Sequence, residues 1–215
     1  MSNYVVLDLE MCKVPKGESR KAFQHGSELI QIGAVVLDES YRIKDTFMTY
    51  VAPQYGRIDS FIQRLTGITP KHTENAPSTE DALRAFVNWL PDDARLVAWS
   101  DSDRSQIEHE ILGKSINIPK LDTYMEDDRW IDCQRAFSDR IDTGKIYRLS
   151  EALVIANIDY DDGAHDALVD AVNTARLFEK IQNRKEFTLS PYLISSDMMD
   201  SYTFDPFKRQ RCVVA

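Results

Sequence analysis

The chain has 215 residues, a length that suits one full domain, and its 43% hydrophobic content is ordinary for a globular protein. Its formal net charge of −9 excludes the strongly basic surface with which proteins coat long duplex nucleic acid. The charge leaves open a protein that meets phosphate groups through bound divalent cations, because such ions change the local electrostatic field.

Cysteine usage and the N-terminal residues predict the compartment. Cys12, Cys133 and Cys212 form no CxxC pair, which argues against a zinc site or a disulfide framework and fits a reducing compartment. The charged residues Asp8 and Glu10 come too early for a signal peptide, and no apolar run approaches membrane-spanning length. We therefore expect a soluble cytoplasmic protein without a membrane partner. Its oligomeric state stays open, a homodimer included.

The first part of the chain is rich in β-branched residues and predicts three strands joined as an antiparallel meander. These strands cover residues 4–10, 28–37 and 42–51. The polar residues 11–26 predict a loop. The first strand ends in Asp8 and Glu10, which project from the same face because side chains alternate along a strand. Two neighbouring carboxylates repel each other unless a cation such as Mg²⁺ or Mn²⁺ lies between them. The alternative is a strand that simply ends in a polar turn.

The middle of the chain predicts alternating helices and strands. We expect helices at 61–68, from Ser78 onward and at 149–156, strands at 95–99 and near 130, and an irregular segment at 116–129. Ser78 and Asp81 have the spacing of a capping box. Asp103 lies where the strand 95–99 is followed by a helix, a position at which α/β proteins bind ligands. The alternative is that Asp101, Ser102 or Asp103 serves only as the helix N-cap.

A histidine and a carboxylate lie at the start of the last predicted helix, which extends to about residue 185. Five helical steps rotate a residue by about 140°, so His165 and Asp170 would not share a face if both were inside the helix. We therefore place His165 in the loop or first turn beside Gly163, with Asp170 held on the helix. Beyond the domain 1–185, residues 186–215 are too apolar for a free tail, and we expect this C-terminal extension to pack on the domain.

These residues resemble the three motifs of the DEDDh 3′–5′ exonucleases, a family of the ribonuclease H-like superfamily. Residues 8–10 resemble the first motif, residues 99–103 the second and residues 163–175 the third, and the segment LTGIT at 65–69 also recurs in the family. The resemblance covers residues 3–182, and the tryptophan in the second motif is typical of exoribonucleases that trim small or structured RNAs. It implies an α/β fold with a central mixed five-stranded sheet flanked by helices.

The resemblance implies a metal-dependent hydrolase that releases nucleoside 5′-monophosphates from the 3′ ends of single-stranded RNA or DNA, with RNA favoured. We expect two Mg²⁺ or Mn²⁺ ions, an attacking water, and His165 as general base. The expected metal ligands are Asp8, Glu10, Asp103 and Asp170, with Asp8 shared by both ions. The expected substrate contacts are Leu9, Met11, Leu65 and Arg104. The alternative for Met11 and Leu65 is ordinary core packing, and for Arg104 it is a solvated charge on the helix.

Two departures and three alternatives accompany this hypothesis. Met11 and Cys12 stand where the family often has small or hydroxylated residues, and Ser100 replaces a frequent glycine. Asp101 is the rival of Asp103 as metal ligand. The alternatives are a proofreading-type DNA exonuclease, a catalytically silent nucleic-acid-binding adaptor on the same fold, and an acidic protein with only a structural cation.

Overall fold

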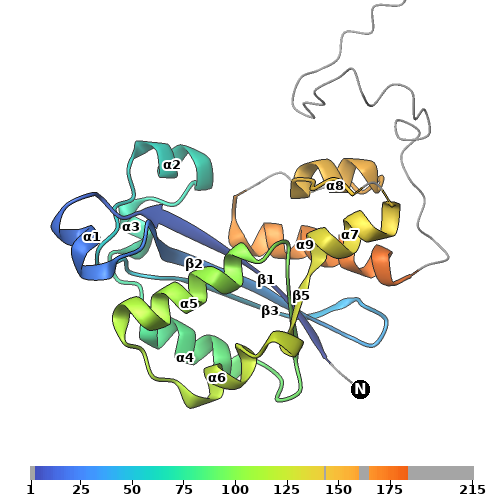
Figure 1. Cartoon of the computed structure of the whole chain (residues 1–215), viewed down its shortest axis with the longest axis horizontal. Helices are drawn as coiled ribbons and strands as arrows, with labels where there is room; N and C mark the ends of the chain where they lie inside the picture. Colours follow the sequence, from blue (N-terminus) through green and yellow to red (C-terminus); the bar gives the residue numbers. More distant parts are fainter. Residues whose placement is uncertain (1–2, 143, 160–164, 184–215) are drawn as a thin grey trace, which may run out of the picture.

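A mixed five-stranded sheet organises the computed structural model, which describes residues 3–142, 144–159 and 165–183 (Figure 1). The strands are β1 (Tyr4–Lys13), β2 (Ser27–Leu37), β3 (Ile43–Tyr50), β4 (Arg95–Ala98) and β5 (Trp130–Asp132). They lie in the order β3-β2-β1-β4-β5. Strands β1, β2 and β3 are antiparallel, whereas β4 and β5 run parallel to β1. The predicted fold class and the predicted meander are therefore confirmed.

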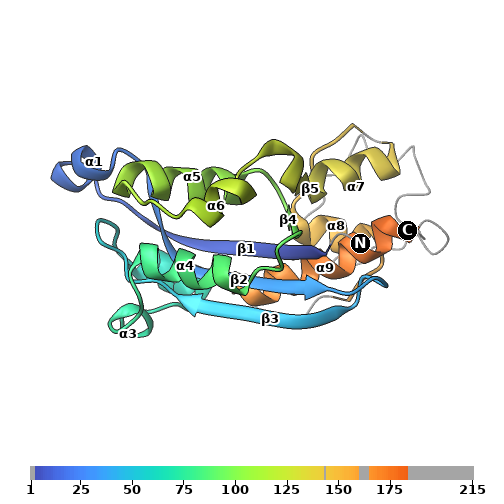
Figure 2. The ribbon, with the colours of Figure 1, turned by 90° about the horizontal axis from the view of Figure 1, so that it is seen from below.

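Helices cover both faces of this sheet (Figure 2). They are α1 (Glu18–Phe23), α2 (Ser60–Thr66), α3 (Pro70–Thr73), α4 (Thr79–Trp89), α5 (Ser102–Lys114), α6 (Pro119–Tyr124), α7 (Cys133–Ile141), α8 (Leu149–Ile155) and α9 (Ala167–Gln182), with a 3-10 turn at Asp127–Arg129. Helices α4, α5 and α6 share one buried core with the sheet, and α7, α8 and α9 share the other. None of the described helices is both long and apolar enough to cross a membrane.

The alternation of side chains along β1 assigns the acids to one face. Val5, Leu7 and Leu9 point into the core beneath α4, α5 and α6, whereas Val6 points into the core beneath α9. Asp8 follows Val6 at a spacing of two residues and therefore lies on the α9 face. Glu10 also lies on the α9 face, because the β-bulge in the pairing of β1 with β2 begins only after Glu10.

Two segments predicted to be irregular contain short helices. In residues 11–26, β1 continues to Lys13 and α1 follows, with Phe23 as its buried residue. In residues 116–129, α6 begins at Pro119, the first helical position, where proline is favoured. Helices this short bury too few apolar side chains to produce a helical period in the sequence. The polar composition of both segments therefore predicted irregular structure instead.

The helix boundaries are otherwise near their predicted positions. The Ser78 hydroxyl accepts a hydrogen bond from the Asp81 N–H, so the predicted cap of α4 is confirmed. Pro70 begins the short helix α3 where the sequence predicted only the end of the preceding helix. Residues 160–164 lie outside the described part, and they include most of the turn predicted at 159–163. Residues 186–215 also lie outside it, so the predicted packing of the C-terminal extension stays a prediction.

The N-terminal end of α9 lies directly on β2 at Gly33. A Cβ atom at Gly33 would overlap the backbone of Ala167 and Leu168, so only glycine fits. The neighbouring Gln31 is fully buried; its Oε1 accepts a hydrogen bond from the Ala167 N–H at 3.1 Å, and its Nε2 donates to Asp166 Oδ2 at 3.2 Å. Together these contacts hold the start of α9 against the sheet face that carries the acids.

We expect Gly33→Ala to lower the free energy of unfolding by about 1–3 kcal/mol, because the added methyl group overlaps backbone atoms that cannot rotate away. Urea denaturation followed by circular dichroism measures the change. Gly26→Ala is the matched control, since the only side chain near its Cβ is the flexible end of Arg20 at 3.3 Å. Equal midpoints for the two variants would contradict the predicted close contact of α9 with β2.

Candidate active site

The first two acids of the candidate site lie on β1, opposite residues of β2. Asp8 pairs with Gly33 and Glu10 pairs with Gln31, so both lie under the N-terminal end of α9. Glu10 is 8% exposed and Asp8 is partly buried. Strand β1 thus presents two carboxylates at the point where the helix begins.

His165 and Asp170 come from the other side of this site. His165 precedes α9 in a left-handed conformation with φ of +70°, and Asp166 is the N-cap of the helix. The His165 N–H donates a hydrogen bond to Asp170 Oδ2 at 2.9 Å. A ring nitrogen of His165 and carboxylate oxygens of Glu10 and Asp170 all lie within 4.8 Å of one another. The placement of His165 outside the helix removes the rotational mismatch of five helical steps.

Asp103 reaches the site from the first turn of α5. Its side chain is 4% exposed, and its Oδ1 accepts a hydrogen bond from the Leu9 N–H at 3.1 Å. Strand β4 pairs with β1 only as far as Val6, so Asp103 supplies the acceptor that the next residue of a longer β4 would have offered. Asp101 is exposed and makes no side-chain cap hydrogen bond. The structure therefore brings Asp103, and not Asp101, beside the acids of β1.

Burial raises the pKa values of all four carboxyl groups, and repulsion from neighbouring acids adds to the shift in each. Burial raises the pKa of Glu10 to about 8 and of Asp103 to about 7, and Asp170 contributes charge repulsion to both. Burial, with repulsion from the other acids, also raises the pKa of Asp8 well above its usual value. The pKa of Asp170 is raised mainly by burial, although the His165 N–H opposes this shift. Such crowded oxygen donors fit a divalent cation, which would relieve the repulsion.

We expect Mg²⁺ to raise the melting temperature by several degrees more at about pH 8 than at about pH 5. The raised pKa of Glu10 stabilises the metal-free fold below its ordinary value of 4.5, and this contribution is lost as the pH rises through about 8. Protons also compete with the cation for the same oxygens at low pH. Thermal unfolding with Mg²⁺ and with EDTA measures both shifts. Equal shifts at the two pH values would contradict a cation held by these carboxylates.

The predicted substrate contacts differ in their surroundings. The Leu9 side chain is buried in the core under α4, on the sheet face away from the acids, so contact with a substrate is left to its backbone. Met11 is partly buried against the same core, and Leu65 on α2 is 37% exposed. Arg104 Nη2 donates to Asp127 Oδ1 at 2.6 Å and to the Met125 carbonyl oxygen at 2.8 Å. Their contacts with substrate stay predictions.

Sequence reasoning missed two residues that position the site. Asp166 caps α9 by accepting hydrogen bonds from the Leu168 and Val169 N–H groups, and its charge adds to the raised pKa values of Asp8 and Glu10. An aspartate immediately before a helical pattern is a signal for such a cap. Gln31 gave no comparable signal, because its role depends on the contact of β2 with α9.

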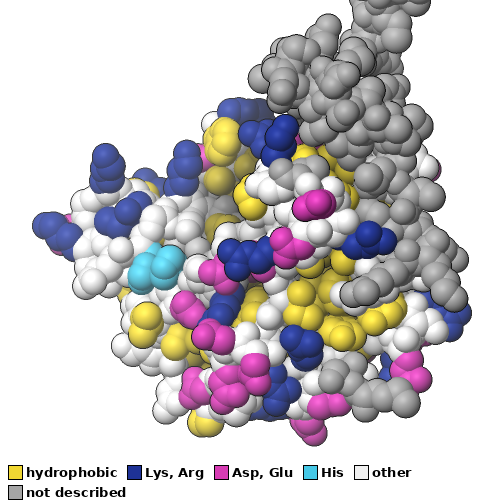
Figure 3. Space-filling view, turned by 45° about the vertical axis from the view of Figure 1, so that its right-hand side comes forward, with side chains coloured by type: hydrophobic (Ala, Val, Ile, Leu, Met, Phe, Trp, Pro, Cys, Tyr) yellow, Lys and Arg dark blue, Asp and Glu magenta, His cyan; other side chains and the backbone are white. Residues whose placement is uncertain are grey.

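Basic and acidic side chains are interspersed on the face shown in Figure 3, and the net charge of the chain is −9. The candidate site therefore depends on local geometry for any attraction of phosphate. Its four acids would repel a phosphate group unless cations lay between them.

Comparisons with known proteins identify similar exonucleases. A family model described as Exonuclease (RNase_T) matches residues 5–178. ERI1 exoribonuclease 2 of Danio rerio is 29% identical over 189 residues, which cover 75% of this chain and 32% of that protein. DNA polymerase III PolC-type of Caldanaerobacter subterraneus is 29% identical over 157 residues, which cover 72% of this chain and 11% of that protein. The chain thus spans less than a third of each of these two relatives.

Two further comparisons concern a shorter relative and a solved structure. DNA polymerase III subunit epsilon of Aquifex aeolicus is 28% identical over 183 residues, which cover 83% of this chain and 79% of that protein. A crystal structure of a full-length 3′-exonuclease has a TM-score of 0.69 at 20% identity, covering 87% of this chain and 85% of that chain, and shows the shared fold. Because the family model spans most of the chain, this protein belongs to the DEDDh 3′–5′ exonuclease family.

Proposed function

We propose that this chain hydrolyses single-stranded nucleic acid from its 3′ end to nucleoside 5′-monophosphates, with RNA as the preferred substrate. The observation that carries the proposal is a cluster of acids beside one imidazole. Oxygens of Glu10 and Asp170 lie within 4.8 Å of a His165 ring nitrogen and of each other. Asp8 and Asp103 join this cluster, because Asp103, Asp170 and Glu10 all raise the pKa of Asp8 by repulsion. Family membership supports the same chemistry. No single one of these residues would support it, since isolated acids on a protein surface are common.

Asp8, Glu10, Asp103 and Asp170 would hold two Mg²⁺ or Mn²⁺ ions. When bound, such ions offset the charge on the scissile phosphate and lower the pKa of a water molecule. The chain itself supplies closely spaced oxygens on elements that are fixed by the sheet. Burial and repulsion both raise the pKa values of Asp8, Glu10 and Asp103, and this crowding of acids supports the proposed ligand set.

His165 would accept the proton of the attacking water at a ring nitrogen. Imidazole suits this task because it titrates near neutral pH. The side chain is exposed, so the proton can pass on to solvent. The hydrogen bond from the His165 N–H to Asp170 fixes the backbone of the base relative to a metal ligand. Base and ligand thus keep their relative position when substrate changes.

The preference for RNA is supported by the tryptophan of the second motif and by the similarity to ERI1 exoribonuclease 2 of Danio rerio. The second candidate is a DNA exonuclease, supported by the similarity to the PolC-type and epsilon polymerase proteins. Both candidates use the same acids and the same histidine. The difference must come from contacts with the sugar, since the 2′-hydroxyl distinguishes RNA from DNA.

The test uses 5′-labelled RNA and DNA of one sequence, incubated with the protein and Mg²⁺ or Mn²⁺. We expect a ladder that shortens by one nucleotide at a time, appears faster on RNA, and is absent on a circular strand without a 3′ end. Faster shortening of DNA would establish the second candidate. No shortening of either substrate would overturn the proposal and support a silent adaptor.

A further inference from the structure

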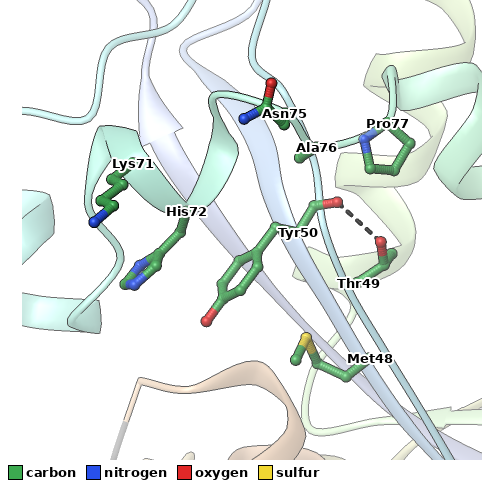
Figure 4. Close-up of a pocket in the computed structure, with 8 residues that line it drawn as sticks. All are labelled: Met48, Thr49, Tyr50, Lys71, His72, Asn75, Ala76 and Pro77. Atoms are coloured by element: carbon green, nitrogen blue, oxygen red, sulfur yellow. Dashed lines mark hydrogen bonds between the residues drawn. The ribbon is translucent and has the colours of Figure 1, made fainter.

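A hollow of about 370 Å³ opens beside the edge strand β3, at the same end of the sheet as the acids. Met48 and Tyr50 form its floor, and Lys71 and His72 of α3 form one side (Figure 4). Neither the proposed hydrolysis nor the five residues of the candidate active site uses this hollow.

Strand register places the hollow on the face of the sheet that carries the acids. Tyr50 pairs with Gln31 on β2, and Gln31 pairs with Glu10 on β1. Likewise, Met48 pairs with Gly33 on β2, and Gly33 pairs with Asp8 on β1. Directly paired residues project from the same face, and two strand spacings measure about 10 Å. The floor of the hollow therefore lies about 10 Å from the acids. Strand β2 lies between them, and the start of α9 packs on it at Gly33.

Two aromatic rings stack on each other at this position, which leaves the outer face of the stack for a base. The Tyr50 and His72 rings are stacked, with centroids 5.1 Å apart and an interplanar angle of 10°. His72 Nδ1 accepts a hydrogen bond from the Thr69 N–H at 3.1 Å, so the neutral ring carries its proton on Nε2. That hydrogen bond caps α3 and fixes the ring before any ligand arrives. Such preformed aromatic surfaces stack on nucleobases irrespective of sequence.

A positive charge and an apolar group accompany the rings. Lys71 is exposed, and its ammonium forms no ion pair with any described residue. Met48 is 47% exposed and leaves a soft apolar surface for a base or sugar. A ring pair for the base and a cation for the phosphate are the two contacts that a nucleotide in a single strand requires.

We infer that this hollow is a subsite for a nucleotide of the single strand that lies 5′ to the scissile bond. The inference rests on the proposed function, since the 3′ end of the strand would occupy the acids. At a rise of about 3.4 Å for each stacked nucleotide, 10 Å corresponds to about three nucleotides. Tyr50 and His72 would stack on the base, and Lys71 would contact a phosphate.

The first test measures binding of a fluorescent single-stranded decanucleotide by anisotropy, with Ca²⁺ in place of Mg²⁺ and the strand checked for cleavage afterwards. We expect Lys71→Ala to reduce the slope of log affinity against log salt concentration by about 0.7, the value for one phosphate contact with a single strand. Lys44→Ala, which removes the same charge from an exposed position near the start of β3, should leave the slope unchanged. Equal slopes for Lys71→Ala and the unaltered protein would overturn the inference.

The second test addresses stacking. We expect Tyr50→Leu to weaken decanucleotide binding by about fivefold or more, and Tyr50→Phe, which keeps the ring, to restore it. A dinucleotide is too short to span the acids and the hollow, so its affinity should distinguish these variants far less. If Tyr50→Leu and Tyr50→Phe bind the decanucleotide equally, the stacking role is wrong.

These binding results are independent of turnover. An unaltered protein that produces a ladder while all four variants bind alike would reject the subsite and keep the proposed function. A protein that binds through Lys71 and Tyr50 without producing a ladder would reject the hydrolysis and keep the nucleotide subsite.

Discussion

Asp8→Asn is expected to slow release of the 3′-terminal nucleotide by about a thousandfold or more. The substitution keeps the shape of the side chain but removes one negative charge from the proposed cation site, and several kcal/mol of transition-state stabilisation depend on those cations. Initial rates on 5′-labelled RNA measure the loss. Circular dichroism should show an unchanged fold, because the burial of Asp8 disfavours its charged form.

Asp101→Asn is the matched control for this experiment. It removes the same charge from the same segment as Asp103, yet Asp101 is exposed and makes no capping hydrogen bond with its side chain. Its rate should stay within about twofold of the unaltered protein, as for a surface charge that touches nothing in the site. Near-normal turnover in Asp8→Asn, or a large loss in Asp101→Asn, would refute the assignment of the metal ligands.

His165→Ala is expected to slow turnover by about a hundredfold or more, the usual effect of removing a general base. The same initial-rate assay measures it. The variant should keep the rise in melting temperature that Mg²⁺ produces, because a base is not required to hold the cation. Asp8→Asn should lose much of that rise. The two variants thus separate proton transfer from cation binding.

The proximity of His165 to Glu10 and Asp170 makes this comparison informative, since the three together could also ligate a cation. Loss of both turnover and the Mg²⁺-dependent rise in His165→Ala would indicate a ligand role instead of a base. An unchanged rate would show that another group accepts the proton. His109→Ala is a suitable control, because His109 lies outside the candidate active site and stacks on His25 with ring centroids 4.1 Å apart.

The sequence predicted those parts of the fold and site that depend on local spacing. The alternation along β1 predicted that Asp8 and Glu10 share a face, and the mismatch of five helical steps predicted that His165 precedes the helix. Asp103 was predicted from the resemblance to the second family motif, since its position after a buried strand fitted a helix cap equally well. In the first two cases the pattern lies within one element or at its end, where period and capping rules apply.

The remaining features depend on contacts between distant segments. Gly33 and Gln31 read as ordinary strand residues until α9 lies across β2. The stacked rings of Tyr50 and His72 join the edge strand β3 to the helix α3. With four residues, α3 is too short to produce a periodic sequence pattern. Such contacts have no local sequence signal, because the partner is chosen by the packing of the whole sheet.

The short length of β4 gives Asp103 two duties at once. Its Oδ1 completes the hydrogen bonding of the Leu9 N–H where β4 no longer accompanies β1, and its carboxylate belongs to the acidic cluster. Asp103→Ala would leave the buried Leu9 N–H without an acceptor and would also remove a carboxylate. Asp103→Asn could keep the acceptor for the Leu9 N–H. An inactive Asp103→Ala protein therefore cannot by itself distinguish a missing cation from a displaced first strand.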